Sequence, residues 1–196
     1  MQKQTLLPRR PLKKTAETIA VFLSHPDHDV MFFDEGRFGL QPVTGRCWAL
    51  KGRRQYTRVR TGYKSFYIYA GISPQTGEGF VLFLPWVNTD IMNVYMQELS
   101  RAYHNKQLML IFDQAGWHKS KDIQIPQNIQ VEQLPPYSPE LNPVEKLWQW
   151  LRRQVCRNRL FESEENLMNE LSSALNGLSN EQLKQLCNCN YLLHYK

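Results

Sequence analysis

The chain has 196 residues, of which 42% are hydrophobic and 12% aromatic, a composition that is typical of a folded domain and excludes a disordered chain. No apolar stretch approaches the roughly 18 residues that cross a bilayer, and no signal-peptide core follows the charged N-terminus, which predicts a cytoplasmic location and no membrane partner. The four cysteines follow no zinc-binding spacing and are too few for a disulfide scaffold, so we expect free thiols.

Positive charge is concentrated in the first third of the chain. The formal net charge is +6, but residues 1–64 hold 13 basic and 5 acidic residues, whereas residues 65–196 hold 11 and 13. A first basic block contains no acidic residue and consists of Arg37, Arg46, Lys51, Arg53, Arg54, Arg58, Arg60 and Lys64. A second block consists of Lys146, Arg152, Arg153, Arg157 and Arg159. This pattern predicts a polyanionic partner such as nucleic acid; the alternative is a basic face that contacts only solvent.

Hydrophobic periodicity predicts a mixed α/β domain after a proline-containing leader or linker over residues 1–28, which has room for a short helix near residues 15–23. The apolar run from Val30 to Phe33 is typical of a strand buried on both faces. The predicted elements in chain order are a strand over 30–40, a loop over 41–62, hairpin strands over 65–72 and 79–84, a helix over 88–104, strands over 108–112 and 129–134, a helix over 141–159, and amphipathic helices over 163–175 and 179–189.

Three acidic residues stand where buried elements begin or end. Asp34 and Asp113 each follow an apolar run, Val30–Phe33 and Leu108–Phe112, and Glu145 lies on the helix after a proline-rich turn. A carboxylate at the end of a buried strand is costly unless it binds something, and neighbouring strands bring such ends to one edge of a sheet. For each acid alone, the alternative is a salt bridge or a solvated strand end. Together they favour Mg²⁺, with two ions roughly 3.5–4 Å apart for phosphodiester chemistry.

The three acids lie in the segments FFDEGRFGL, LIFDQAGWHKS and LPPYSPELNPVEKLWQWLR. These segments resemble the three acidic motifs of the mariner-type superfamily of DDE transposases, in its bacterial insertion-sequence branch, and the resemblance covers residues 30–160. It implies an RNase H-like α/β fold, in which helices flank a central mixed β-sheet, with the catalytic domain over residues 29–160. We expect residues 161–196 to form C-terminal helices that pack on this domain.

The resemblance also implies a metal-binding catalytic triad of Asp34, Asp113 and Glu145, which would hold two Mg²⁺ or Mn²⁺ ions. Glu35 and Glu140 are competitors, since each stands beside a proposed ligand or in the turn before it. Strand alternation should direct Glu35 elsewhere, and Glu140 precedes the helix.

The implied function is metal-dependent DNA cleavage and strand transfer in transposition, by a nucleoid-associated homodimer or larger assembly that binds element ends and target DNA. The residues expected to contact DNA are Arg37, Arg46, Arg53, Arg54, Arg58, Arg60, Lys64, His118, Arg152 and Arg153. Trp117, Trp148 and Trp150 are candidates for base stacking, although Trp148 is expected to fill the core. Too little chain precedes Asp34 for the helix-turn-helix region of full-length relatives, which predicts a separately encoded or frame-fused module.

Two alternatives stay open from the sequence. The first is a structure-selective or RNA–DNA hybrid nuclease on the same fold. The second is a catalytically silent transposon remnant that only binds DNA or a protein partner. The complete set of three acids favours an active site, whereas the expected missing N-terminal module keeps the second alternative open.

Overall fold

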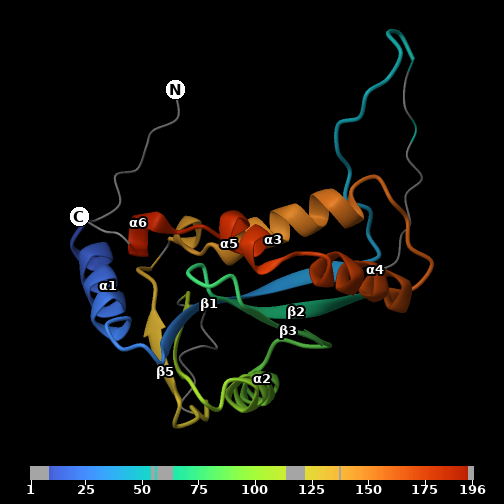
Figure 1. Ribbon diagram of the computed structural model, residues 1–196. Helices are drawn as coiled ribbons and strands as arrows, with labels where there is room; N and C mark the ends of the chain where they lie inside the picture. Colours follow the sequence, from blue (N-terminus) through green and yellow to red (C-terminus); the bar gives the residue numbers. More distant parts are fainter. Residues whose placement is uncertain (1–8, 54–55, 57–63, 114–121, 137, 194–196) are drawn as a thin grey trace.

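A five-stranded mixed β-sheet forms the centre of the computed structural model, which describes residues 9–53, 56, 64–113, 122–136 and 138–193 (Figure 1). Its strands are β1 (His28–Gly39), β2 (Ser65–Ile72), β3 (Gly79–Leu84), β4 (Gln107–Phe112) and β5 (Ile129–Gln133). Their order across the sheet is β3-β2-β1-β4-β5. β1 pairs antiparallel with β2 and parallel with β4, while β2 with β3 is antiparallel and β4 with β5 is parallel. β1 is therefore the central strand.

Helices cover both faces of this sheet, as Figure 1 shows. Helix α2 (Thr89–Ala102) packs on one face, where its Tyr95 and Met96 join the core. The other face carries α1 (Arg9–Phe22), α3 (Val144–Leu151) with a π-helical turn over Arg152–Cys156, α4 (Glu164–Asn176), α5 (Asn180–Leu186) and α6 (Asn190–Leu193). The predicted α/β fold with helices flanking a mixed sheet is confirmed. No helix within the described ranges is long and apolar enough to cross a membrane.

The apolar run of β1 supplies side chains to both cores, as its sequence predicts. Val30 and Phe32 lie in the core under α1 and α3, whereas Met31 and Phe33 lie in the core under α2. All four side chains are at most 1% exposed. Because side chains alternate along a strand, even-numbered residues of β1 face α3 and odd-numbered residues face α2.

Two helices differ in extent from the prediction, and prolines account for both differences. The helix expected over residues 141–159 is divided: a 3₁₀ turn spans Pro139–Leu141, and α3 starts only at Val144. Pro143 has no N–H, and the Asn142 side chain accepts the Val144 N–H at 3.2 Å instead. Helix α1 starts earlier than expected, at Arg9, and it tolerates Pro11 because the missing N–H falls in the first turn, where it costs no helical bond.

The C-terminal helices share the core of the face that carries α3. Leu167, Leu171 and Leu192 are at most 1% exposed and belong to the same hydrophobic cluster as Phe32 and Leu147. The four cysteines are free thiols, of which Cys47 is exposed and the other three are buried. The division of the chain at residues 28 and 160 stays a prediction.

Gly36 of β1 leaves no room for a side chain. A Cβ atom there would lie 2.8 Å from Trp148 Cδ2 and 2.9 Å from Phe38 Cε2. We therefore expect Gly36→Ala to lower the free energy of unfolding by about 1–3 kcal/mol, since overpacking displaces a buried ring. Chemical denaturation measures this loss.

The matched control is Gly177→Ala, because a Cβ atom at residue 177 would make ordinary contacts of 3.4 and 3.5 Å, and the backbone φ is −77°. This variant should be neutral or more stable by up to about 1 kcal/mol. Equal effects of the two substitutions would contradict the packing argument.

Candidate active site and the adjacent basic groove

Two of the predicted acids stand level with each other on neighbouring parallel strands, Asp34 within β1 and Asp113 directly after the last residue of β4. The β1–β4 register pairs Phe32 with Ile111, and Asp34 and Asp113 each follow two residues later. They therefore stand at the same level of the sheet. Phe32 and Ile111 both point into the core under α3, and alternation assigns Asp34 and Asp113 to that face. Parallel pairing thus places Asp113 level with Asp34 on the neighbouring strand.

The third acid, Glu145, comes from the first turn of α3. Asn142 fixes this turn to the sheet, since its side-chain N–H donates to the Phe33 carbonyl at 2.7 Å, next to Asp34. Asn142 is itself only 3% exposed. The half-buried Glu145 lies near enough to Asp34 for their charges to repel each other.

Asp34 is a half-buried carboxylate in a negatively charged environment. Burial raises its pKa to about 7, and repulsion from Glu35 and Glu145 adds to this shift. The indole N–H of Trp148 donates to Asp34 Oδ2 at 2.7 Å and acts in the opposite direction, because it stabilises the charged form. A divalent cation would relieve the same repulsion, so these residues fit a metal.

The two competing acids have neighbours outside this cluster, and the choice of Glu145 over them stays a prediction. Glu35 is odd-numbered on β1 and contributes, after burial, to the raised pKa of Tyr69 and Tyr95, which belong to the core under α2. Glu140 is exposed on the 3₁₀ turn and contributes to the raised pKa of Tyr191, which burial mainly causes.

Carboxylates alone make up this set, which is the donor chemistry that Mg²⁺ and Mn²⁺ prefer. Among the side chains that the structure describes, no three His, Cys, Asp or Glu residues lie close enough together to form a complete metal site. Two features of the proposed site are therefore present. Glu145 lies near Asp34, and the strand register places Asp113 level with Asp34.

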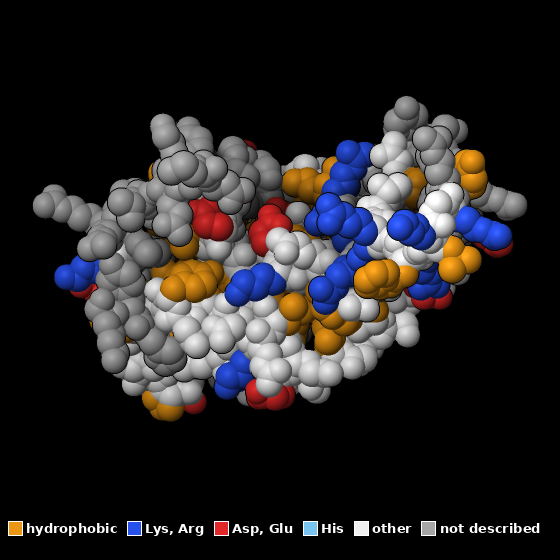
Figure 2. All heavy atoms as spheres, turned by 90° about the horizontal axis from the view of Figure 1, so that it is seen from above, with side chains coloured by type: hydrophobic (Ala, Val, Ile, Leu, Met, Phe, Trp, Pro, Cys, Tyr) orange, Lys and Arg blue, Asp and Glu red, His pale blue; other side chains and the backbone are white. Residues whose placement is uncertain are grey.

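A basic groove of about 280 Å³ lies at the C-terminal end of β1, where its lining residues Phe38 and Cys156 belong to the core under α3. Arg37, Lys64 and Arg152 line it. Arg37 Nε donates to Ser65 Oγ at 3.0 Å, and the Arg152 guanidinium stacks over the Phe38 ring, 5.1 Å from its centroid. Figure 2 shows Lys and Arg side chains gathered around this end of the face, with acidic side chains nearer the middle.

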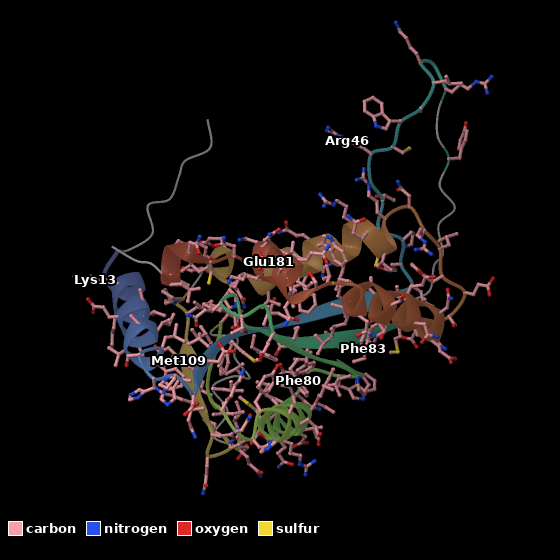
Figure 3. All side chains as sticks on the ribbon, viewed as in Figure 1. Lys13, Arg46, Phe80, Phe83, Met109 and Glu181 are labelled. Atoms are coloured by element: carbon pink, nitrogen blue, oxygen red, sulfur yellow. The ribbon has the colours of Figure 1, made fainter. Side chains whose placement is uncertain are left out.

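The two basic blocks of the sequence meet beside this groove. Val43 pairs with Arg157, and the Asn158 side chain exchanges hydrogen bonds of 3.0 and 3.2 Å with the backbone of Gly45. Arg157 also donates to the carbonyl of Arg46, which Figure 3 labels on the segment that stands away from the sheet.

The other predicted DNA contacts are only partly described. Arg46, Arg53 and Arg153 are exposed. Arg54, Arg58, Arg60, His118 and Trp117 lie outside the described residues.

Sequence reasoning missed the residues that support the acids. Trp148 fills the core as expected, with 1% exposure, but its bond to Asp34 was not foreseen. The sequence also does not indicate that Asn142 bonds to the Phe33 carbonyl. The available signals were Asn142 before a proline and Trp148 one helical turn after Glu145, on the same side of α3.

The family model described as DDE superfamily endonuclease matches residues 29–168, which is more than half of the chain. The chain belongs to the DDE superfamily of endonucleases. This DDE chain is 37% identical over 119 residues to the uncharacterized protein y4pE/y4sA of Sinorhizobium fredii, and the match covers 60% of this chain and 88% of that protein. It is 28% identical over 137 residues to the uncharacterized 39 kDa protein of insertion element IS630 from Shigella sonnei. This match covers 67% of this chain and 40% of that protein.

Solved structures of the Mos1 transposase share the fold. The Mos1 mariner paired-end complex with Mn has a TM-score of 0.71 and the Mos1 strand transfer complex one of 0.69. Each is 16% identical, and each match covers 99% of this chain but only 62% of the Mos1 chain. The expected RNase H-like fold and the resemblance to mariner-type DDE transposases are confirmed.

Asn142 should be a stability determinant of the site. In Asn142→Ala, the Phe33 carbonyl loses its partner at a buried position, and the Val144 N–H loses its acceptor. We expect a loss of about 1–3 kcal/mol in the free energy of unfolding, measured by chemical denaturation.

The control is Asn93→Ala, because Asn93 makes the same pair of bonds at the surface, to the Asp122 carbonyl and the Gln124 N–H. Water replaces those bonds, so the loss should stay below about 1 kcal/mol. A smaller loss at residue 142 than at residue 93 would refute the assignment.

Proposed function

We propose that this DDE chain carries the catalytic site of an insertion-sequence transposase, which cleaves DNA and transfers the cut strand to a target. The observation that supports this most is that Glu145, in the first turn of α3, lies near Asp34, while the β1–β4 register places Asp113 level with Asp34. Membership of the DDE superfamily and the insertion-element relative support the same reading.

Asp34, Asp113 and Glu145 would hold two Mg²⁺ or Mn²⁺ ions. When bound, such ions lower the pKa of an attacking water and stabilise the charge on a leaving oxygen of a phosphodiester. The chain's own contribution is to fix the three carboxylates on rigid elements: β1 and β4 through their pairing, and α3 through Asn142. No nucleophilic side chain is required, since water and then the freed 3′-hydroxyl are the attacking groups.

The basic groove would hold the DNA backbone on the approach to the acids. Phe38 and Arg152 line it on the face that Asp34 shares, and Arg37 and Lys64 line it from the end of β1 and from the residue before β2. Contacts with phosphates position a duplex without reading its sequence, so recognition of element ends would fall to another module. We further propose that the chain acts at the nucleoid as a dimer or larger assembly, because transposition joins two element ends to one target.

Removing one carboxylate charge at a time tests the catalytic assignment. We expect Asp34→Asn, Asp113→Asn and Glu145→Gln each to lower Mn²⁺-dependent DNA cleavage by at least roughly 100-fold, since each removes a ligand charge with little change in shape. Affinity for DNA should stay within about threefold of the unaltered protein. Gel analysis of labelled duplexes measures cleavage, and fluorescence anisotropy measures binding.

Glu35→Gln and Glu140→Gln are the matched controls, since they remove the same charge beside the site, and both should retain cleavage. A triad variant with full cleavage would remove that residue from the site. Pre-cut ends on a supercoiled target distinguish the reactions: joined strands indicate a transposase, whereas cut ends alone indicate a nuclease. DNA binding without either product from the unaltered protein would favour a silent remnant.

Neutralising the groove tests the phosphate contacts. The triple variant Arg37→Gln, Lys64→Gln and Arg152→Gln should weaken binding to two duplexes of unrelated sequence equally. It should also flatten the log–log dependence of affinity on salt by about 0.9 for each phosphate that the protein no longer neutralises. A salt titration by fluorescence anisotropy measures both effects.

The triple variant Lys13→Gln, Lys14→Gln and Arg101→Gln removes the same charge from exposed positions on α1 and α2. Figure 3 places Lys13 at the opposite end of the molecule from Arg46. Equal losses of DNA affinity in the two triple variants would show that only net charge matters, and would reject the proposal that the groove binds the DNA backbone.

A further inference from the structure

We propose that Trp148 is a positioning residue for Asp34: its indole N–H holds one carboxylate oxygen and thereby orients the carboxylate toward the metal ions and toward Glu145. This inference rests on the proposed function, because it assigns Asp34 the role of a metal ligand.

The contact is a direct one between a buried donor and an acid of the site. Trp148 Nε1 lies 2.7 Å from Asp34 Oδ2, and Trp148 is 1% exposed. An indole N–H only donates and does not change protonation, so it is a fixed partner. A carboxylate oxygen has two lone pairs, so one bond from the indole restricts rotation of the group while leaving acceptor sites for cations. Outer partners of this kind commonly orient metal-binding carboxylates.

The indole itself is immobilised by β1. Asp34, Gly36 and Phe38 lie on the same face of this strand, since they are two residues apart. The Trp148 ring fits over Gly36, where a Cβ atom would lie 2.8 Å from Cδ2, and it meets the edge of the Phe38 ring with centroids 5.9 Å apart and planes at 71°. The strand that carries the carboxylate therefore also shapes the place of its hydrogen-bond donor.

Trp148 also ties the two elements of the site together. It lies one turn after Glu145 on α3, and its indole reaches Asp34 on β1. The distance between the two acids therefore depends on where this ring lies. If the ring only filled the core, any hydrogen-bond acceptor would satisfy its N–H, and a backbone carbonyl would be sufficient. Here the acceptor is a proposed catalytic carboxylate, which a purely structural role does not require.

Mn²⁺ binding to the protein with an isosteric replacement tests the role of the N–H. Benzothienylalanine at residue 148 keeps the shape of tryptophan and replaces the N–H by sulfur. We expect Mn²⁺ affinity, followed by the electron paramagnetic resonance of free Mn²⁺, to fall about 10- to 100-fold. The same replacement at Trp150, a half-buried neighbour, should leave the affinity unchanged.

The indole N–H resonances of the unaltered protein give an independent readout. The chain has five tryptophans, and Trp148→Phe assigns the signal of residue 148 by its loss. We expect this signal to shift on addition of Mg²⁺ and in Asp34→Asn, while the Trp150 signal stays in place.

Either of two results overturns the inference. In the first, the protein with the isostere at residue 148 binds Mn²⁺ with the same affinity as the unaltered protein. In the second, the Trp148 signal shifts neither on addition of Mg²⁺ nor in Asp34→Asn. Failure of the proposed function looks different. In that case Asp34→Asn itself leaves Mn²⁺ affinity and DNA cleavage unchanged, whatever the replacement at residue 148 does.

Discussion

The parallel pairing of β1 with β4 is the constraint on which the site depends. β1 has neighbours on both edges and apolar side chains on both faces, so its position is fixed from four sides. A slip of one residue against β4 would reverse every side chain and place Phe33 where Phe32 now lies. The two cores therefore hold the register, and the register determines that Asp34 and Asp113 stand level and on one face.

Burial of Asp34 at this edge is unfavourable by itself, and the surrounding structure offsets only part of the cost. The desolvated carboxylate faces repulsion from Glu35 and Glu145, and the Trp148 indole supplies one strong hydrogen bond in return. An arrangement selected for stability alone would place a neutral or apolar side chain here. An acidic residue at this position is consistent with a site whose favourable partner is a cation, and local destabilisation is expected where function rather than packing fixes a residue.

Much of this arrangement is readable from the sequence because it follows from periodicity. The run Val30 to Phe33 predicts a doubly buried strand, and strand alternation separates Asp34 from Glu35. The supporting contacts are not readable in this way. The bond from Asn142 to Phe33 joins residues 109 positions apart, and that from Trp148 to Asp34 joins residues 114 positions apart. No local pattern encodes such contacts, since they depend on how α3 packs on β1. The helix begins after Pro143 rather than at residue 141, although the apolar periodicity of the sequence continues across the proline.

The same packing explains how positive and negative groups coexist on one face. Arg152 is held over the Phe38 ring, and its guanidinium also approaches the Arg37 carbonyl, so aromatic and backbone contacts place it at the groove end of β1. Phe38 in turn packs against Trp148, and Trp148 bonds to Asp34. Two aromatic rings thus separate the arginine from the carboxylate along the strand. Direct pairing of the two charges would neutralise both, whereas this spacing leaves the arginine available to a phosphate and the carboxylate available to a cation.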